Sequence, residues 1–172
     1  MKKIIKGLFL SLALLSGAGS VCVAMHTLPA EPPIELPKEI LPLPGNFHFS
    51  KYLPGLRLAE MCDLIIHHGG YGSCQTGLFT GTPQVIIPTF SERESNARRI
   101  ASLGAGEFVL PKTTTNNKKD IDLSEFRKKV KQVLSMPDYL KNAERYSQKL
   151  KTYGGPKKAV GVIENFVNKM IA

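Results

Sequence analysis

A glycine-rich segment, HHGGYGS at residues 67–73, holds the residues with the clearest capacity for chemistry. It ends a largely apolar run at residues 63–67 and leads into a segment with helical spacing at residues 73–80. Glycines allow the backbone to turn sharply and to approach a ligand closely, and the first amides of a helix bind phosphate readily. The segment therefore predicts a phosphate-binding turn between a buried strand and a helix. In such a turn, Ser73 either caps the helix or donates its hydroxyl to a phosphate oxygen.

Two better-known phosphate-binding motifs do not fit this segment. No Gly-Lys-Ser or Gly-Lys-Thr follows the glycines, as a Walker loop requires, and the spacing is not the GxGxxG of dinucleotide-binding folds. Many glycine turns between a strand and a helix only save space. From this segment alone, a ligand-binding and a purely structural interpretation both remain open.

The elements that would position this turn alternate between strands and helices. Apolar runs bounded by turn residues predict strands, and apolar residues three and four apart predict helices. The predicted strands are residues 46–51, 63–67, 84–88 and 107–110, and the predicted helices are residues 55–62, 73–80, 92–103, 123–135, 138–150 and 156–171. This alternation predicts an α/β fold, a Rossmann-like parallel sheet with helices on both faces.

The composition is that of one globular domain with a basic surface. The chain has 172 residues, of which 42% are hydrophobic, and a formal net charge of +9. A basic surface suits anionic ligands such as nucleotide diphosphates, anionic membranes or nucleic acid. Many basic residues between positions 127 and 151 are spaced as on a solvated helix face, with a membrane or partner surface as the alternative. Because aromatic residues are not interleaved with them as in single-strand binders, nucleic acid is not a predicted partner.

The three cysteines, Cys22, Cys62 and Cys74, show neither a CxxC motif nor the spacing of a metal site. Each lies among apolar or small residues. An odd number of cysteines in such surroundings predicts reduced thiols in a core. The cysteines thus indicate a reducing compartment, and no metal site is predicted.

The N-terminal residues have two interpretations. Residues 1–24 resemble a secretory signal, with a basic start, an apolar stretch at residues 7–15 and small residues at a cleavage site near Ala24. Alternatively, residues 3–16 form an apolar helix and residues 20–25 form a buried strand of the sheet. We expect the second interpretation, and with it a cytoplasmic protein; the first would make the protein secreted or periplasmic. The predicted organisation is an apolar helix at residues 1–20 and a domain at residues 21–172, with a proline-rich loop at residues 27–44.

Further motifs surround the glycine-rich segment. They are GTPQVIIP at residues 81–88 and NARR at residues 96–99, preceded by Tyr52-Leu53-Pro54 and followed by Gly154-Gly155. Together with HHGGYGS, they resemble the donor-binding domain of family 1 GT-B glycosyltransferases, a group that includes UDP-glucuronosyl, macrolide, sterol and plant secondary-metabolite transferases. The resemblance spans residues 46–170 and extends to Val21 under the strand interpretation. It implies the C-terminal half of a GT-B fold, which binds the nucleotide-sugar.

The resemblance also implies roles for individual residues. His68 would contact the donor diphosphate, whereas His67 would point into the sheet or pack against the neighbouring strand. The implied binding residues are His68, Gly69, Gly70, Gly72 and Ser73 for the diphosphate, Leu53 and Pro54 for the base, usually uracil, and Glu92 and Arg93 for the donor sugar. None of them is expected to be a catalytic residue.

Three positions depart from the family pattern. The family usually has an Asp-Gln pair where this sequence has Glu92 and Arg93. Glu92 can still accept sugar hydroxyls, but Arg93 cannot both donate and accept as a glutamine does. The glutamate that many members use for the ribose is Thr76 here. The donor sugar and the strength of ribose binding are therefore left open.

By this resemblance, the chain is the nucleotide-sugar-binding domain of a glycosyltransferase, for hexosyl transfer from a UDP-sugar. The acceptor site and the general base of this fold lie in an N-terminal domain, for which the sequence shows no counterpart. We therefore expect an N-terminally truncated domain, inactive alone, that needs an acceptor domain or a separate acceptor-binding subunit. The UDP-sugar is expected as donor substrate without a further cofactor, and membrane contact only through a partner or the N-terminal segment. The alternative is a non-catalytic, secreted or pseudo-enzymatic binding domain.

Overall fold

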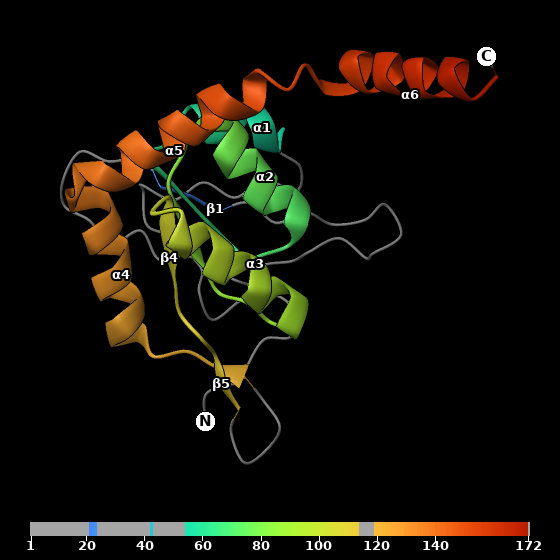
Figure 1. Cartoon of the computed structure of the whole chain (residues 1–172). Coiled ribbons are helices and arrows are strands. Elements are labelled where there is room, and N and C mark those ends of the chain that lie inside the picture. The colour runs from blue at the N-terminus through green and yellow to red at the C-terminus, as the bar shows by residue number, and fades with distance from the viewer. Residues whose placement is uncertain (1–20, 24–41, 43–53, 114–118, 172) are drawn as a thin grey trace.

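The computed structural model describes residues 21–23, 42, 54–113 and 119–171, which are coloured in Figure 1. The predicted helix at residues 3–16 and the predicted strand at residues 46–51 lie outside the described residues. The same holds for the predicted proline-rich loop except for its residue Pro42.

The central sheet consists of four parallel strands in sequence order. They are β1 (Val21–Val23), β2 (Leu64–His67), β3 (Gln84–Ile86) and β4 (Gly106–Phe108). Ile65 pairs with Gln84, and Gln84 pairs with Gly106, so Gln84 lies in the interior of the sheet. The parallel sheet is confirmed, as is a strand within residues 20–25. Because the strands are parallel, their carboxyl ends share one edge, where α/β folds bind ligands.

Six helices are present among the described residues. They are α1 (Gly55–Glu60), α2 (Tyr71–Thr80), α3 (Ser91–Ser102), α4 (Leu123–Ser135), α5 (Pro137–Lys151) and α6 (Gly155–Ile171). Local chemistry explains several ends. Asp122 Oδ1 accepts the amides of Ser124 and Glu125 at 2.9 and 3.1 Å and so caps the start of α4. Gly81 ends α2 with φ of 80°, a conformation that glycine adopts without strain.

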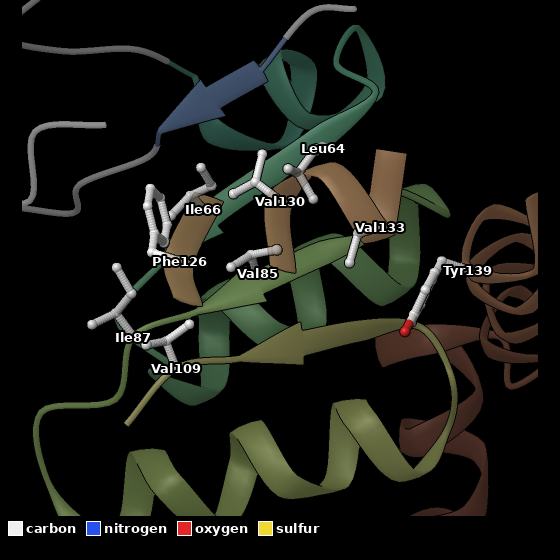
Figure 2. Close-up of a cluster of buried hydrophobic side chains, with 9 residues drawn as sticks. All are labelled: Leu64, Ile66, Val85, Ile87, Val109, Phe126, Val130, Val133 and Tyr139. Carbon is white, nitrogen blue, oxygen red and sulfur yellow. The ribbon is translucent and has the colours of Figure 1, made fainter. Parts of the chain in front are cut away.

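Helices cover both faces of the sheet, as predicted. On one face, Phe126, Val130 and Val133 of α4 point from the helix towards Ile66 and Val85 of the sheet, as Figure 2 shows. On the other face, Ile86 packs with residues of α2, α3 and α5, including Cys74, Leu78, Ala97, Ile100 and Ala143. Val85 and Ile86 point to opposite sides because successive side chains of a strand alternate. The sheet is therefore the middle layer of three.

A small second sheet joins β5 (Lys112–Thr113) and β6 (Lys119–Asp120) in antiparallel pairing. The polar run at residues 113–119 predicts a loop; Thr113 and Lys119 belong instead to the strands, and residues 114–118 lie outside the described residues. The strands are exposed and two residues long, so they carry none of the apolar alternation from which a strand is predicted.

The last helix, α6, extends away from the rest of the molecule (Figure 1). None of its residues is buried. Within the described ranges, no helix combines the length and the apolar character that a membrane crossing requires.

The cysteines differ from one another in the structure. Cys62 is disulfide-bonded, so the prediction of reduced thiols is wrong for this residue. An odd count and apolar neighbours do not reveal which cysteines meet in space. Cys74 is free and buried, and burial raises the pKa of its thiol to about 12. The prediction of a buried, reduced thiol is confirmed for Cys74.

Candidate functional site

The glycine-rich turn joins the end of β2 to the start of α2 at the carboxyl edge of the sheet. Gly69 is buried and has φ of +86°, a left-handed conformation that favours glycine. A Cβ at this position would lie 2.8 Å from the carbonyl oxygen of Arg93 and 2.9 Å from Cγ2 of Ile86. Both its backbone conformation and its surroundings therefore require glycine at position 69.

His67 is buried in the sheet with 3% of its surface exposed, which confirms its predicted orientation. Its Nε2 lies 2.8 Å from Oε1 of Gln84 on β3, and its Nδ1 accepts the amide of Gly69 at 3.0 Å. Burial lowers the pKa of the imidazole to about 4, and the nearby His68 acts in the same direction. His67 is therefore neutral at physiological pH.

His68 is half-buried and its ring lies against Gly70. A Cβ on Gly70 would come within 2.6 Å of Nε2 of His68, so glycine at position 70 leaves room for the ring. The structure thus brings His68 together with the glycine turn, on the outer side of the strand end from which His67 points inward.

Helix α2 begins one residue after Gly70, which occupies the N-cap and offers no side chain to the first amides. Those amides have no acceptor within the helix. Gly72 lies in the first turn, and a Cβ there would meet no atom within 4 Å. Ser73 also lies in this turn rather than at the cap, so the alternative in which Ser73 caps the helix is wrong. The sequence pattern places the helix start late because glycines are poor helix formers.

The start of α3 lies beside the same turn. Asn96 Nδ2 donates to the carbonyl of Gly69 at 3.0 Å and to Oε1 of Glu92 at 2.6 Å. The carbonyl of Arg93 packs against Gly69, while its guanidinium donates to Thr89 Oγ1 at 2.5 Å. Glu92 and Arg93, predicted from a separate motif, thus lie next to the turn.

The two residues predicted beside the base have different outcomes. Leu53 lies outside the described residues. Pro54 is exposed and precedes α1, where its carbonyl accepts the amide of Leu58 at 3.0 Å. Contact of these residues with a base stays a prediction.

Two residues around the turn were not among the predicted site residues. Gln84 is fully buried in β3 and bonds His67, and Asn96 bonds Gly69. The sequence carries a signal for Gln84, because a polar side chain that begins the apolar run QVII must find buried partners. Asn96 begins the NARR motif, but the motif does not indicate that its side chain bonds Gly69.

Comparisons with known proteins agree with this geometry. A family model described as "Erythromycin biosynthesis protein CIII-like, C-terminal domain" matches residues 17–166. The NDP-glycosyltransferase YjiC of Bacillus licheniformis is 33% identical over 131 residues, which are 76% of this chain and 31% of that protein. The chain thus spans about a third of the length of this relative.

Solved structures lead to the same group. The spinosyn forosaminyltransferase SpnP matches with a TM-score of 0.64 and 26% identity, over 86% of this chain and 35% of that one. The Streptomyces sp. SF2575 glycosyltransferase SsfS6, in complex with thymidine diphosphate, matches with a TM-score of 0.54 and 26% identity, over 66% of this chain and 28% of that one. These similarities confirm the predicted fold class and the predicted resemblance to the C-terminal part of GT-B glycosyltransferases.

Proposed function

The chain belongs to the family of erythromycin biosynthesis protein CIII-like C-terminal domains, and from this premise we propose that its glycine turn binds the diphosphate of a nucleotide-sugar. In this proposal, amides from Gly70 to Ser73 and the imidazole of His68 contact the diphosphate. Gly69, which was also expected to bind it, shapes the turn instead, because its amide and carbonyl bond His67 and Asn96. Glu92 and Arg93 face the sugar, and Leu53 and Pro54 lie beside the base.

The observation that carries the proposal is the open, uncapped start of α2. An anion placed there accepts bonds from helix amides that have no acceptor within the helix, and it is stabilised by the helix dipole. Glycine at positions 70 and 72 keeps side chains out of this space, apart from the ring of His68. The net charge of +9 further attracts a diphosphate.

The nucleoside and the sugar are separate parts of the proposal. We expect a pyrimidine base, uracil first, and a hexose. SsfS6 is a glycosyltransferase solved with thymidine diphosphate, and Thr76 of this chain bonds the carbonyl of Gly72 at 3.0 Å instead of offering a carboxylate to a ribose. Thymidine diphosphate is therefore the comparison ligand for UDP.

Titration calorimetry of the chain with UDP and with thymidine diphosphate tests the proposal. Gly72→Leu fills the open space at the start of α2, and we expect it to weaken binding of either ligand more than tenfold, because a side chain there displaces the diphosphate. Gly161→Leu in α6 is the matched control, since a Cβ there also meets no atom within 4 Å. Equal affinity of the two variants for these ligands would show that the diphosphate does not bind at this turn.

Transfer of the sugar is a further step. We expect the 172-residue chain to bind the nucleotide weakly and to release no UDP from a UDP-sugar when acceptor is present, because the proposed site contains a phosphate-binding turn and no general base for an acceptor. Steady UDP release by the purified chain would contradict this. An acceptor-binding domain or subunit is expected to restore transfer; in the non-catalytic alternative, none does.

The N-terminal segment and the location are linked in the proposal. Cleavage near Ala24 would detach β1, which pairs with β2 through Val21 and Val23, so we propose that the segment is retained. A cytoplasmic location stays a prediction, and the disulfide at Cys62 favours the alternative, an oxidising compartment. Mass spectrometry of the mature protein, with and without thiol alkylation, determines both the first residue and the state of Cys62.

A further inference from the structure

We propose that Gln84 and His67 are a pair of positioning residues that hold the Gly69 amide, and thereby the diphosphate-binding turn, in its binding geometry. The expected effect of this pair on the affinity for a nucleoside diphosphate rests on the proposed function. It concerns two side chains that are buried beneath the turn, with 0% and 3% of their surfaces exposed. They act through Gly69 rather than by touching the ligand.

The hydrogen bonds of the pair determine one another. Nδ1 of His67 accepts the Gly69 amide at 3.0 Å, so the proton of the neutral ring is on Nε2. Nε2 then donates to Oε1 of Gln84 at 2.8 Å, which turns the Gln84 amide nitrogen towards the carbonyl of Cys74 at 3.3 Å. The three bonds form one chain, in which each group donates to the next, from the Gly69 amide to the Cys74 carbonyl. This chain connects the turn, both central strands and α2.

The Gln84 amide group is tightly packed. A Cβ on Gly77 of α2 would lie 2.4 Å from Cδ of Gln84, so the helix backbone lies directly on the Gln84 amide group. On the opposite side of the turn, Asn96 holds the carbonyl of Gly69 at 3.0 Å. The amide and the carbonyl of Gly69 are therefore both fixed by side chains before any ligand arrives. A turn that is fixed in advance avoids the entropic cost of ordering it upon binding.

The test replaces Gln84 and compares it with a buried hydrogen-bonding residue that lies two positions before β3. Gln84→Met keeps the size of the side chain and removes its bonds. Thr82→Val is the matched control, because Thr82 is also buried and donates to the carbonyl of Ala59 at 2.7 Å, away from the turn. We expect Gln84→Met to weaken UDP binding about three- to tenfold, and Thr82→Val to leave it within about twofold of the unchanged chain.

Nuclear magnetic resonance supplies a measurement that needs no ligand. In the unchanged chain, we expect the Gly69 amide to be protected from hydrogen exchange and the ¹⁵N shifts of His67 to report a proton on Nε2. In Gln84→Met, we expect Gly69 to lose protection by more than the change in global stability explains, and Thr82→Val to keep it. A purely structural role for Gln84 would lower protection throughout the sheet and leave no excess at Gly69.

A second variant, Gln84→Glu, retains an acceptor for His67 and adds a charge. The buried carboxylate favours the imidazolium and raises the pKa of His67. Once Nδ1 is protonated, it no longer accepts the Gly69 amide. We therefore expect the ratio of the variant's dissociation constant to that of the unchanged chain to rise as pH falls from 8 to 5. Taking the ratio at each pH cancels the titration of UDP itself.

The outcomes separate the two proposals. Excess exchange at Gly69 in Gln84→Met, together with a pH-dependent ratio in Gln84→Glu, supports the positioning role. Normal protection of Gly69 in Gln84→Met overturns it, and so does a ratio that stays flat with pH. If the unchanged chain binds neither UDP nor thymidine diphosphate, the proposed function fails, while the exchange of Gly69 and the ¹⁵N shifts still decide whether Gln84 and His67 hold the turn.

Discussion

Helices α4 and α6 have the same spacing of apolar residues, but these residues are buried in α4 and exposed in α6. In α4, Phe126, Val130 and Val133 are four and three residues apart and expose 7%, 9% and 3% of their surfaces. In α6, Ile163, Val167 and Met170 repeat this spacing and expose 63%, 44% and 73%. The spacing thus specifies a helix with an apolar face, and a neighbouring element decides whether that face contributes to stability.

The same contrast appears between two adjacent residues of one type. His67 points into the sheet, where Gln84 and Gly69 bond both of its nitrogens. His68 is half-buried, and its ring lies against Gly70 of the turn. The side chain that points inward bonds Gly69, and the one that points outward is the proposed contact of the diphosphate. Four predictions test these two contrasts, beginning with the largest expected effect.

Phe126→Ala should cost about 3–5 kcal/mol in the free energy of unfolding. Phe126 packs in the cluster between α4 and the sheet, so its removal leaves a cavity among Ile66, Val85 and Val130 (Figure 2). Urea unfolding followed by circular dichroism measures the loss. A cost below about 1 kcal/mol would mean that α4 is not anchored by this face.

Acidification should destabilise the chain through His67. Burial lowers the pKa of this group to about 4, whereas the unfolded chain has a value near 6.5. The unfolded state therefore binds the proton more readily between these values, so this contribution to stability is complete above pH 6.5 and is lost as pH falls through 4. The difference corresponds to about 3 kcal/mol.

Urea unfolding from pH 7 to pH 4, on the unchanged chain and on His67→Ala, isolates this contribution. Carboxylates elsewhere titrate in both proteins, so only the difference between the two curves belongs to His67. Curves that run parallel over this range would show that His67 is not held neutral by burial.

His68→Ala should weaken UDP binding about ten- to hundredfold, because a hydrogen bond to a charged group contributes about 1.5–3 kcal/mol. His67→Ala should weaken it less and act mainly on stability, since His67 reaches the turn only through Gly69. Calorimetric titration of both folded variants compares the losses. If His67→Ala has an equal or larger effect, the two histidines have been assigned to the wrong sides of the strand.

The order of strands and helices could be predicted from the sequence, because each of these elements has a local signal of its own. Apolar runs identify β2 and β3, and Gly81 marks the end of α2. Element ends are less certain: β3 stops at Ile86, two residues before the predicted end at Pro88. The disulfide at Cys62 depends on proximity in space, which local spacing does not encode.

The candidate site was predicted through its motifs, and its supporting bonds were not. The glycines and His68 form a recognisable run of sequence, whereas Gln84 and Asn96 reach the turn from 15 and 27 residues beyond Gly69 along the chain. Nothing in the spacing of single residues specifies that β3 and α3 place these amides beside Gly69. Such contacts follow from the register of the sheet, in which Ile65 pairs with Gln84.

Phe166→Ala in α6 should change the free energy of unfolding by less than about 0.5 kcal/mol, the smallest of the expected effects. Phe166 exposes 65% of its surface, so the substitution removes little buried area and leaves no cavity. The substitution is identical to Phe126→Ala in α4, which makes the pair a direct test of whether spacing or surroundings determine the contribution of an apolar face. Urea unfolding of both variants at several protein concentrations measures the comparison and detects self-association through α6. A cost for Phe166→Ala comparable with that for Phe126→Ala, at every concentration, would mean that α6 packs against the sheet layers in solution.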